Sequence, residues 1–140
     1  MKQKNFFLAT VIALITLLTM VGCAQSAPVY AQGTEKDNAV AAAAPLTQDM
    51  LDGIQKNDFA LFSKDFDASM VKAMTQDGFN SIVKQFAPYG DFKSSEIVNV
   101  QIVSTYYRVN YKLTYTNKVF TMGVVIPING TPAVSGLWFN

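Results

Sequence analysis

The spacing of the hydrophobic residues changes once along this chain, near Asp91, and that change limits the possible folds more than any other feature. From Phe79 to Phe86 the hydrophobic residues recur every three or four positions, which is helical spacing. From Tyr107 to Tyr115 they alternate with polar residues, which is typical of a half-buried strand. Helices followed by strands predict an α+β domain instead of a βαβ one.

We expect helices first and then four antiparallel strands. The helical segments are 47–56, a short turn within 59–66, 68–74 and 75–86, with Thr47, Asp58 and Thr75 as caps. The strands are 98–103, 107–115, 119–128 and 132–139, with Asn129 and Gly130 in a tight hairpin turn. On the first strand, Val98, Val100 and Ile102 are expected to share the buried face. The predicted fold is a curved four-stranded sheet packed on the N-terminal helices.

The first 22 residues have the layout of an export signal. Lys2 and Lys4 precede an uncharged run from Phe6 to Val21, whose 16 residues are short for a membrane span of roughly 20. The run ends in Met20-Val21-Gly22-Cys23, which resembles the lipobox of bacterial lipoproteins, although Leu is usual where Met20 stands. This resemblance implies that 1–22 is a lipoprotein signal peptide and that Cys23 carries two acyl chains. The membrane would then be a partner, and the protein would lie on its extracytoplasmic face.

Residues 23–44 are predicted to be a flexible tether, and 45–140 the single domain. The tether prediction rests on a composition rich in Ala, Gln and Ser, and on Pro45, which disfavours a helical residue before it. An alternative is ordinary signal cleavage after Val29-Tyr30-Ala31, which would give a soluble secreted interaction module.

Composition excludes several kinds of chemistry. The chain has no histidine and one cysteine, so it cannot build a Ser-His-Asp triad, an imidazole base, a zinc site based on His or Cys, or an internal disulfide. Lys and Arg total 11 and Asp and Glu total 10, and removal of Lys2 and Lys4 leaves 9 against 10. Without clustered positive charge we expect no nucleic-acid partner. We also expect no metal and no cofactor.

Three segments carry a resemblance to a known family. They are Asn57-Asp58-Phe59, the helix end Phe86-Ala87-Pro88-Tyr89-Gly90-Asp91-Phe92-Lys93, and the closing Gly136-Leu137-Trp138-Phe139. Together with the Tyr-rich strand they resemble a bacterial domain of unknown function, found in small lipoproteins and in front of some α/β-hydrolases. That domain is similar to the cystatin-like, nuclear-transport-factor-two-like cone fold. The resemblance covers about 45–140 and implies a pocket between helix and sheet, but no established activity.

We predict a non-catalytic binding domain with an unknown target. The target would be a small apolar ligand, an envelope glycan or an envelope protein. Aromatic side chains are the candidates for lining a pocket or a sheet face. The alternative for each of them is packing in the core. The candidates are Tyr107, Tyr111, Tyr115, Phe120 and Trp138.

Two other functions stay open at this point. A cofactor-free acid–base enzyme of the isomerase or dehydratase type would need a carboxylate with a raised pKa beside a tyrosine. Its candidates are Asp58, Asp65 or Asp67 with Tyr107 or Tyr111. A purely structural module would instead present a contiguous exposed apolar patch without an enclosed pocket.

Overall fold

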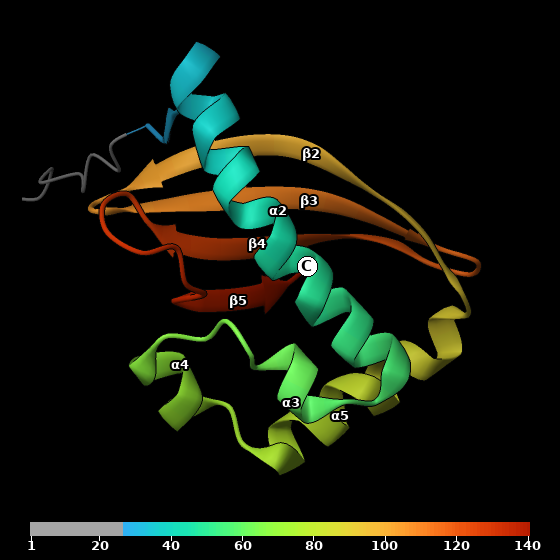
Figure 1. Ribbon diagram of the computed structural model, residues 1–140. Helices are drawn as coiled ribbons and strands as arrows, with labels where there is room; N and C mark the ends of the chain where they lie inside the picture. Colours follow the sequence, from blue (N-terminus) through green and yellow to red (C-terminus); the bar gives the residue numbers. More distant parts are fainter. Residues whose placement is uncertain (1–26) are drawn as a thin grey trace, which may run out of the picture.

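The computed structural model describes residues 27–140, which form an α+β fold with helices on one face of an antiparallel sheet (Figure 1). The helices are α2 (Gly33–Lys56), α3 (Phe59–Phe62), α4 (Ala68–Ala73) and α5 (Gln76–Phe86), followed by the 3-10 turn η1 (Ala87–Tyr89). The strands are β1 (Val29–Tyr30), β2 (Phe92–Val103), β3 (Tyr106–Tyr115), β4 (Val119–Pro127) and β5 (Gly136–Phe139). They pair in chain order, each antiparallel to the next.

Helix α2 corrects the predicted flexible tether. It begins at Gly33 and not at Thr47, so Thr47 is a buried residue of its middle and not its cap. Ala39 and Ala43 are 2% and 0% exposed, and they continue the buried stripe of Leu46 and Met50 at helical spacing. The prediction of a flexible tether is therefore wrong from Gly33 onward, because the alanines pack against the rest of the domain.

Pro45 lies inside α2 without ending it. A proline within a helix removes one backbone donor and crowds the preceding turn. Here Pro45 is exposed, with Ala44 exposed beside it, while Ala43 and Leu46 are buried. The turn that contains Pro45 therefore faces solvent, and the buried stripe on the opposite side stabilises the helix by packing against the rest of the domain.

Strand β1 makes the sheet five-stranded instead of the predicted four-stranded. Val29 pairs with Ile102 and Tyr30 with Gln101. The Ala31 N–H then donates to the Val100 carbonyl at 2.9 Å, and Ala31 is 2% exposed. Folded structure thus begins at Val29 at the latest, and the boundary predicted at Pro45 is corrected. The predicted signal peptide and Cys23 lie outside the described residues.

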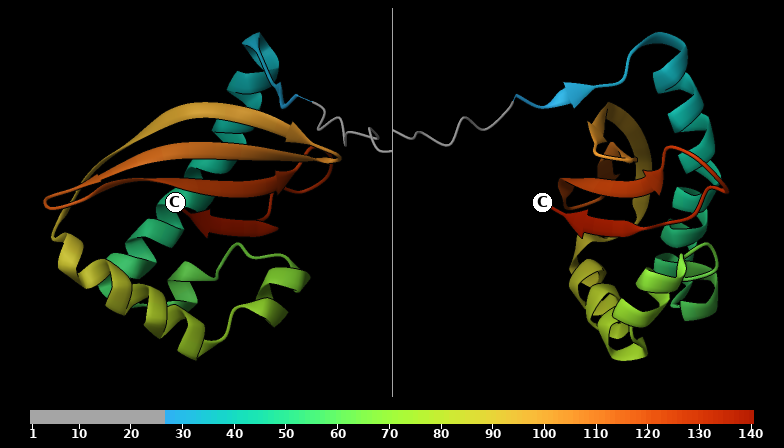
Figure 2. Two further views of the ribbon diagram at one scale, coloured as in Figure 1. Left: turned by 180° about the vertical axis from the view of Figure 1, so that it is seen from behind. Right: turned by 90° about the vertical axis from the view of Figure 1, so that its left-hand side faces the viewer.

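The alternation predicted for the central strands is confirmed. On β3 the side chains of Val109, Tyr111, Leu113 and Tyr115 are buried, and on β4 those of Met122, Val124 and Ile126. Helix α2 crosses this face, and α5 packs at one end of it (Figure 2). The opposite face of the sheet has no helix on it in the described part of the chain.

A bulge in β2 overturns one part of the predicted pattern. Val98 was expected on the buried face but is 52% exposed. The pairing with β3 shifts register between Ile97 and Asn99, so Val98 is the extra residue. Beyond the bulge the alternation resumes, and Val100 is 1% exposed.

The connection between β4 and β5 is longer than the predicted Asn129-Gly130 hairpin turn. Pairing resumes only at Gly136, opposite Val125. In between, Val134 is fully buried, and its N–H and carbonyl bond the backbones of Asp65 and Asp67 at 2.8 and 3.0 Å. The loop therefore runs to the segment between α3 and α4 instead of turning directly into β5.

The predicted caps Asp58, at the first short segment, and Thr75, at α5, are confirmed. Asp58 accepts from the Leu61 N–H at 3.0 Å and Thr75 from the Gly78 N–H at 3.1 Å. Asp67, which was not predicted as a cap, accepts from Ser69 and Met70 at the start of α4. Within residues 27–140, no helix combines the length and apolar character needed to cross a bilayer.

Candidate functional site

An aromatic cluster fills the space where α5 meets the sheet. Phe86 lies at its centre, with ring centroids 5.0 to 5.7 Å from those of its four aromatic neighbours, Tyr89, Tyr115, Phe120 and Phe139. Most of these contacts are edge-to-face or tilted, the arrangements that aromatic pairs prefer. The cluster fixes the end of α5 against β3, β4 and β5.

A pocket of about 340 Å³ lies beside this cluster. Its walls come from the end of α2, from α5 and from the start of β2, and most are apolar. The apolar and aromatic lining includes Ile54, Val83, Phe86, Phe92 and Tyr115, with Gln55 and Asp91 as polar neighbours. The volume is near the lower end of the range for small-molecule sites.

Tyr115 is the predicted site residue that lines this pocket. It is 4% exposed, and its hydroxyl has no hydrogen-bond partner among the described residues. Burial raises the pKa of Tyr115 to about 12, so the hydroxyl stays protonated and keeps its donor. An unsatisfied buried hydroxyl is costly, and because this oxygen is itself out of reach of solvent, Tyr115 presents its ring and not its hydroxyl to the pocket.

Tyr111 and Tyr107 lie on the same sheet face but under α2. The Tyr111 hydroxyl and Thr47 Oγ1 are both buried without a hydrogen bond within the described residues. Burial raises the pKa of Tyr111, and the nearby Thr47 hydroxyl partly opposes this. Tyr107 is half-buried and donates to Glu35 Oε1 at 3.0 Å. These two tyrosines hold α2 on the sheet and do not line the pocket.

Trp138 lies apart from the other predicted site residues. It pairs with Gly123 on β4, whereas Met122 and Val124, on either side of Gly123, point to the buried face. Its ring covers Gly123, where an added Cβ would come 2.0 Å from the indole. The Arg108 guanidinium carbon stacks 3.9 Å from the ring centroid. Trp138 is thus on the open face of the sheet, and only Tyr107, Tyr111, Tyr115 and Phe120 share the helix-covered face.

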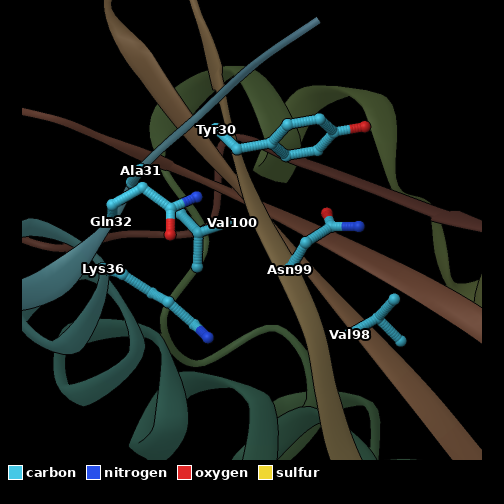
Figure 3. A pocket seen from close by; sticks show the side chains of 7 residues that line it. All are labelled: Tyr30, Ala31, Gln32, Lys36, Val98, Asn99 and Val100. Atoms are coloured by element: carbon cyan, nitrogen blue, oxygen red, sulfur yellow. The ribbon is translucent and has the colours of Figure 1, made fainter.

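A second pocket, of about 260 Å³, lies at the opposite end of β2 (Figure 3). It is bounded by the segment from Tyr30 to Gln32, by Lys36 at the start of α2, and by Asn99 on the edge of β2. Its lining is more polar than that of the first pocket. Sequence reasoning missed it because residues 30–36 were assigned to a tether.

The carboxylates proposed for acid–base catalysis serve other purposes. Hydrogen bonds from Ser69 and Met70 hold the pKa of Asp67 at about 2. Asp58 is an exposed cap. Burial raises the pKa of Asp65, with the Asp49 carboxyl adding to the effect. In the described structure, no hydrogen bond joins any of these three carboxylates to Tyr107 or Tyr111.

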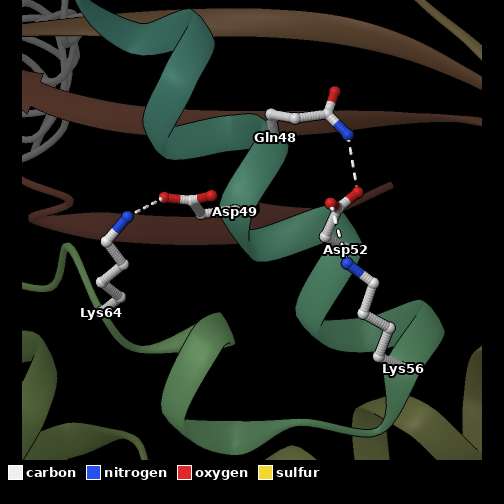
Figure 4. A network of polar contacts seen from close by, with 5 residues as sticks. All are labelled: Gln48, Asp49, Asp52, Lys56 and Lys64. Carbon is white, nitrogen blue, oxygen red and sulfur yellow. Dashed lines mark hydrogen bonds and ion pairs between the residues drawn. The ribbon is translucent and has the colours of Figure 1, made fainter.

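Two acidic side chains of α2, Asp49 and Asp52, form ion pairs on the surface (Figure 4). Asp49 pairs with Lys64 at 2.7 Å, which connects α2 to the segment after α3. Asp52 accepts from Gln48 at 2.7 Å and from Lys56 at 3.3 Å, one helical turn away on either side. Exposed pairs of this kind contribute little to stability, so we interpret them as part of the solvated surface.

Residues 27–140 contain no group of three or more acidic or cysteine side chains placed to hold a metal ion.

We compared the chain with protein-family models, with curated proteins and with solved structures. None of them matches. The functional argument therefore rests on the residues and on the geometry above.

Proposed function

We propose that this protein is a lipid-anchored protein of the bacterial cell envelope whose domain binds a small apolar ligand without catalysis. The observation that carries the anchoring is the position of β1. Val29 and Tyr30 pair with β2, and Ala31 is buried. Cleavage after Ala31, the alternative to lipidation of Cys23, would remove this strand from the mature protein. Processing at Cys23 keeps it.

We propose further that the fold is cone-like, as the family resemblance implies. In support, the long helix α2 crosses one face of an antiparallel sheet whose strands follow each other in chain order (Figure 1). The 340 Å³ pocket between α5, the end of α2 and the sheet lies between helix and sheet, where such a fold leaves space.

The chemistry of this pocket favours a ligand that is mostly apolar. Ile54, Val83, Phe92 and the ring of Tyr115 provide apolar walls. The unpartnered Tyr115 hydroxyl is itself buried, so it adds no polar contact at the pocket surface. A glycan, which needs several polar contacts, suits this lining less well.

Binding can be tested with N-phenyl-1-naphthylamine, an uncharged apolar fluorophore. The protein is the mature chain with Cys23→Ala, which needs no detergent. We expect a fluorescence increase that saturates, and at least tenfold weaker binding for Val83→Trp, because the larger ring fills the pocket. Val71→Trp is the control, since Val71 is another helical valine, 59% exposed on α4 and outside the pocket.

Tyr115→Phe tests the state of the buried hydroxyl. It keeps the ring and removes the unpartnered hydroxyl, so we expect unchanged binding together with a free energy of unfolding about 1 kcal/mol higher. Equal binding by wild type, Val83→Trp and Val71→Trp would rule out this pocket as the binding site. A Tyr115→Phe variant less stable than wild type would mean that the hydroxyl has a partner in the folded protein.

The acid–base enzyme remains the less favoured alternative. Such an enzyme needs a carboxylate whose pKa is near neutral, placed in a cleft beside a proton donor. Asp67 has a pKa of about 2, and Asp58 caps a helix on the surface. Asp91, which borders the pocket, is exposed and pairs with Lys93 at 3.5 Å. Asp65 is the candidate whose pKa burial raises, but within the described residues no hydrogen bond joins it to Tyr107 or Tyr111, which is why the proposal omits catalysis.

A further inference from the structure

The folded domain begins very close to the expected anchor point. Val29 lies six positions after Cys23 in the sequence. A fully extended chain gains at most about 3.5 Å per residue, so Cys23 lies within about 20 Å of Val29 in any conformation. If Cys23 carries acyl chains, the end of the domain that contains β1 must lie near the bilayer surface.

That end of the domain exposes apolar and aromatic side chains. Val29 and Tyr30 on β1 are 60% and 42% exposed, and Val103 and Tyr106 at the β2–β3 turn are 39% and 38% exposed. Val103 pairs with Tyr106, Tyr30 pairs with Gln101, and Val29 pairs with Ile102. Tyr30, Val103 and Tyr106 therefore lie on the open face of the sheet, and Val29 lies on the other face. These four residues at one end of the sheet are here named the hairpin-end patch. Figure 1 shows the end of β2 beside the blue segment that contains β1.

The composition of the patch suits the interface of a bilayer. None of its four residues is charged, and the turn between Val103 and Tyr106 consists of Ser104 and Thr105. Tyrosine is enriched at membrane–water interfaces because its ring is apolar and its hydroxyl is hydrated. Lys36 lines the adjacent pocket with Tyr30, and its ammonium group suits a lipid phosphate (Figure 3).

The other end of the sheet differs in character. The β3–β4 turn contains Lys118, and the start of β2 contains Asp91 and Lys93. These side chains are charged and exposed, as expected of a surface that faces water. The β2–β3 turn, at the same end of the sheet as β1, thus carries no charged side chain, whereas the β3–β4 turn carries Lys118.

We propose that the hairpin-end patch lies in the interface of the membrane and fixes the orientation of the domain. This inference rests on the proposed lipid anchor at Cys23. The two acyl chains provide the attachment, and the patch, which is too small to bind alone, orients the attached domain. The pocket lined by Phe92 and Tyr115 lies at the opposite end of β2 and β3, which this orientation places away from the bilayer.

The test compares two engineered cysteines in the acylated protein, purified from membranes and placed in phosphatidylethanolamine–phosphatidylglycerol vesicles. Val103→Cys puts a probe in the patch, and Val119→Cys puts one at the opposite end of the sheet. Both are exposed valines next to a turn, at 39% and 56%. An acylated Cys23 has no free thiol, so a thiol-reactive environment-sensitive fluorophore labels the engineered site alone.

We expect brominated lipid tails to quench the probe at residue 103 at least threefold more than the probe at residue 119, and aqueous iodide to show the reverse order. Tyr106→Cys is a second patch position, in case labelling at residue 103 disturbs the turn. Equal quenching at both ends of an acylated protein would overturn the proposed orientation while the anchor stands. A protein whose mass shows no acyl groups would overturn the anchor, and the orientation with it.

Discussion

Replacing Ala43 with glutamate is expected to lower the free energy of unfolding by about 3–5 kcal/mol, the usual cost of an unpaired charge in a protein interior. Ala43 is fully buried on the stripe of α2 that faces the sheet and the other helices. Its neighbours on that stripe at helical spacing are Ala39, Leu46 and Thr47, and none of them carries a charge that could pair with the glutamate. Urea denaturation followed by circular dichroism measures the loss.

Ala44→Glu is the matched control for this prediction. Ala44 is the next residue of the same helix but is exposed, so the same substitution should change stability by less than about 0.5 kcal/mol. If the two variants were equally stable, residues 33–44 would behave as a tether, and the packing described for α2 would be incorrect.

Phe62→Ala is expected to destabilise the domain by about 3–5 kcal/mol. Phe62 is fully buried and packs on Phe79 and Phe66, with ring centroids 4.9 and 5.2 Å away. Its backbone also touches Gly53 of α2 so closely that a Cβ at Gly53 would lie 2.5 Å from the Phe62 nitrogen. That close approach prevents α2 and α3 from closing over the space left by the ring, so the cavity should persist.

Urea denaturation with Val71→Ala as the control measures this effect. Val71 is 59% exposed, so its truncation should cost little. A loss below about 1 kcal/mol for Phe62→Ala would mean that α3 is not part of the core. Because natural domains are stable by only about 5–15 kcal/mol, the expected loss is a large fraction of the total.

The elements with strong periodicity were predictable from the sequence. The alternation from Tyr107 to Tyr115 placed the buried face of β3 correctly, and the spacing from Phe79 to Phe86 located α5 together with its Thr75 cap. In both cases large side chains mark the buried face. Burial of such residues contributes most of the stability, so their pattern determines the structure.

The first half of α2 was missed because alanines mark its buried face. Ala43 and Ala39 lie four and eight positions before Thr47, which continues the helical stripe, but the hydrophobicity of alanine is too low to stand out. The spacing of these two alanines nevertheless indicated the buried face of a helix. Pro45 argued against a helix on local grounds, and tertiary packing outweighed the local preference.

The position of Trp138 could not be read from the sequence. Which face a residue of β5 occupies depends on the register with β4, and a shift of one residue reverses it. That register is set by the long connection that carries Val134 to the backbones of Asp65 and Asp67. The bulge at Val98 could not be predicted for the same reason, since its position depends on how β2 pairs with β3.

Of the predicted site residues, Tyr115 alone reaches the pocket, because its place at the end of β3 brings it beside α5.

The most direct test of the central claim is the intact mass of the protein extracted from the membranes of bacterial cells that express it, beside a Cys23→Ala variant. We predict a mature chain that begins at Cys23 and carries added acyl mass, and a variant that lacks this mass. A mature chain that begins at Gln32 without lipid would contradict the account. It would mean that β1 is removed by processing and that the protein is secreted in soluble form.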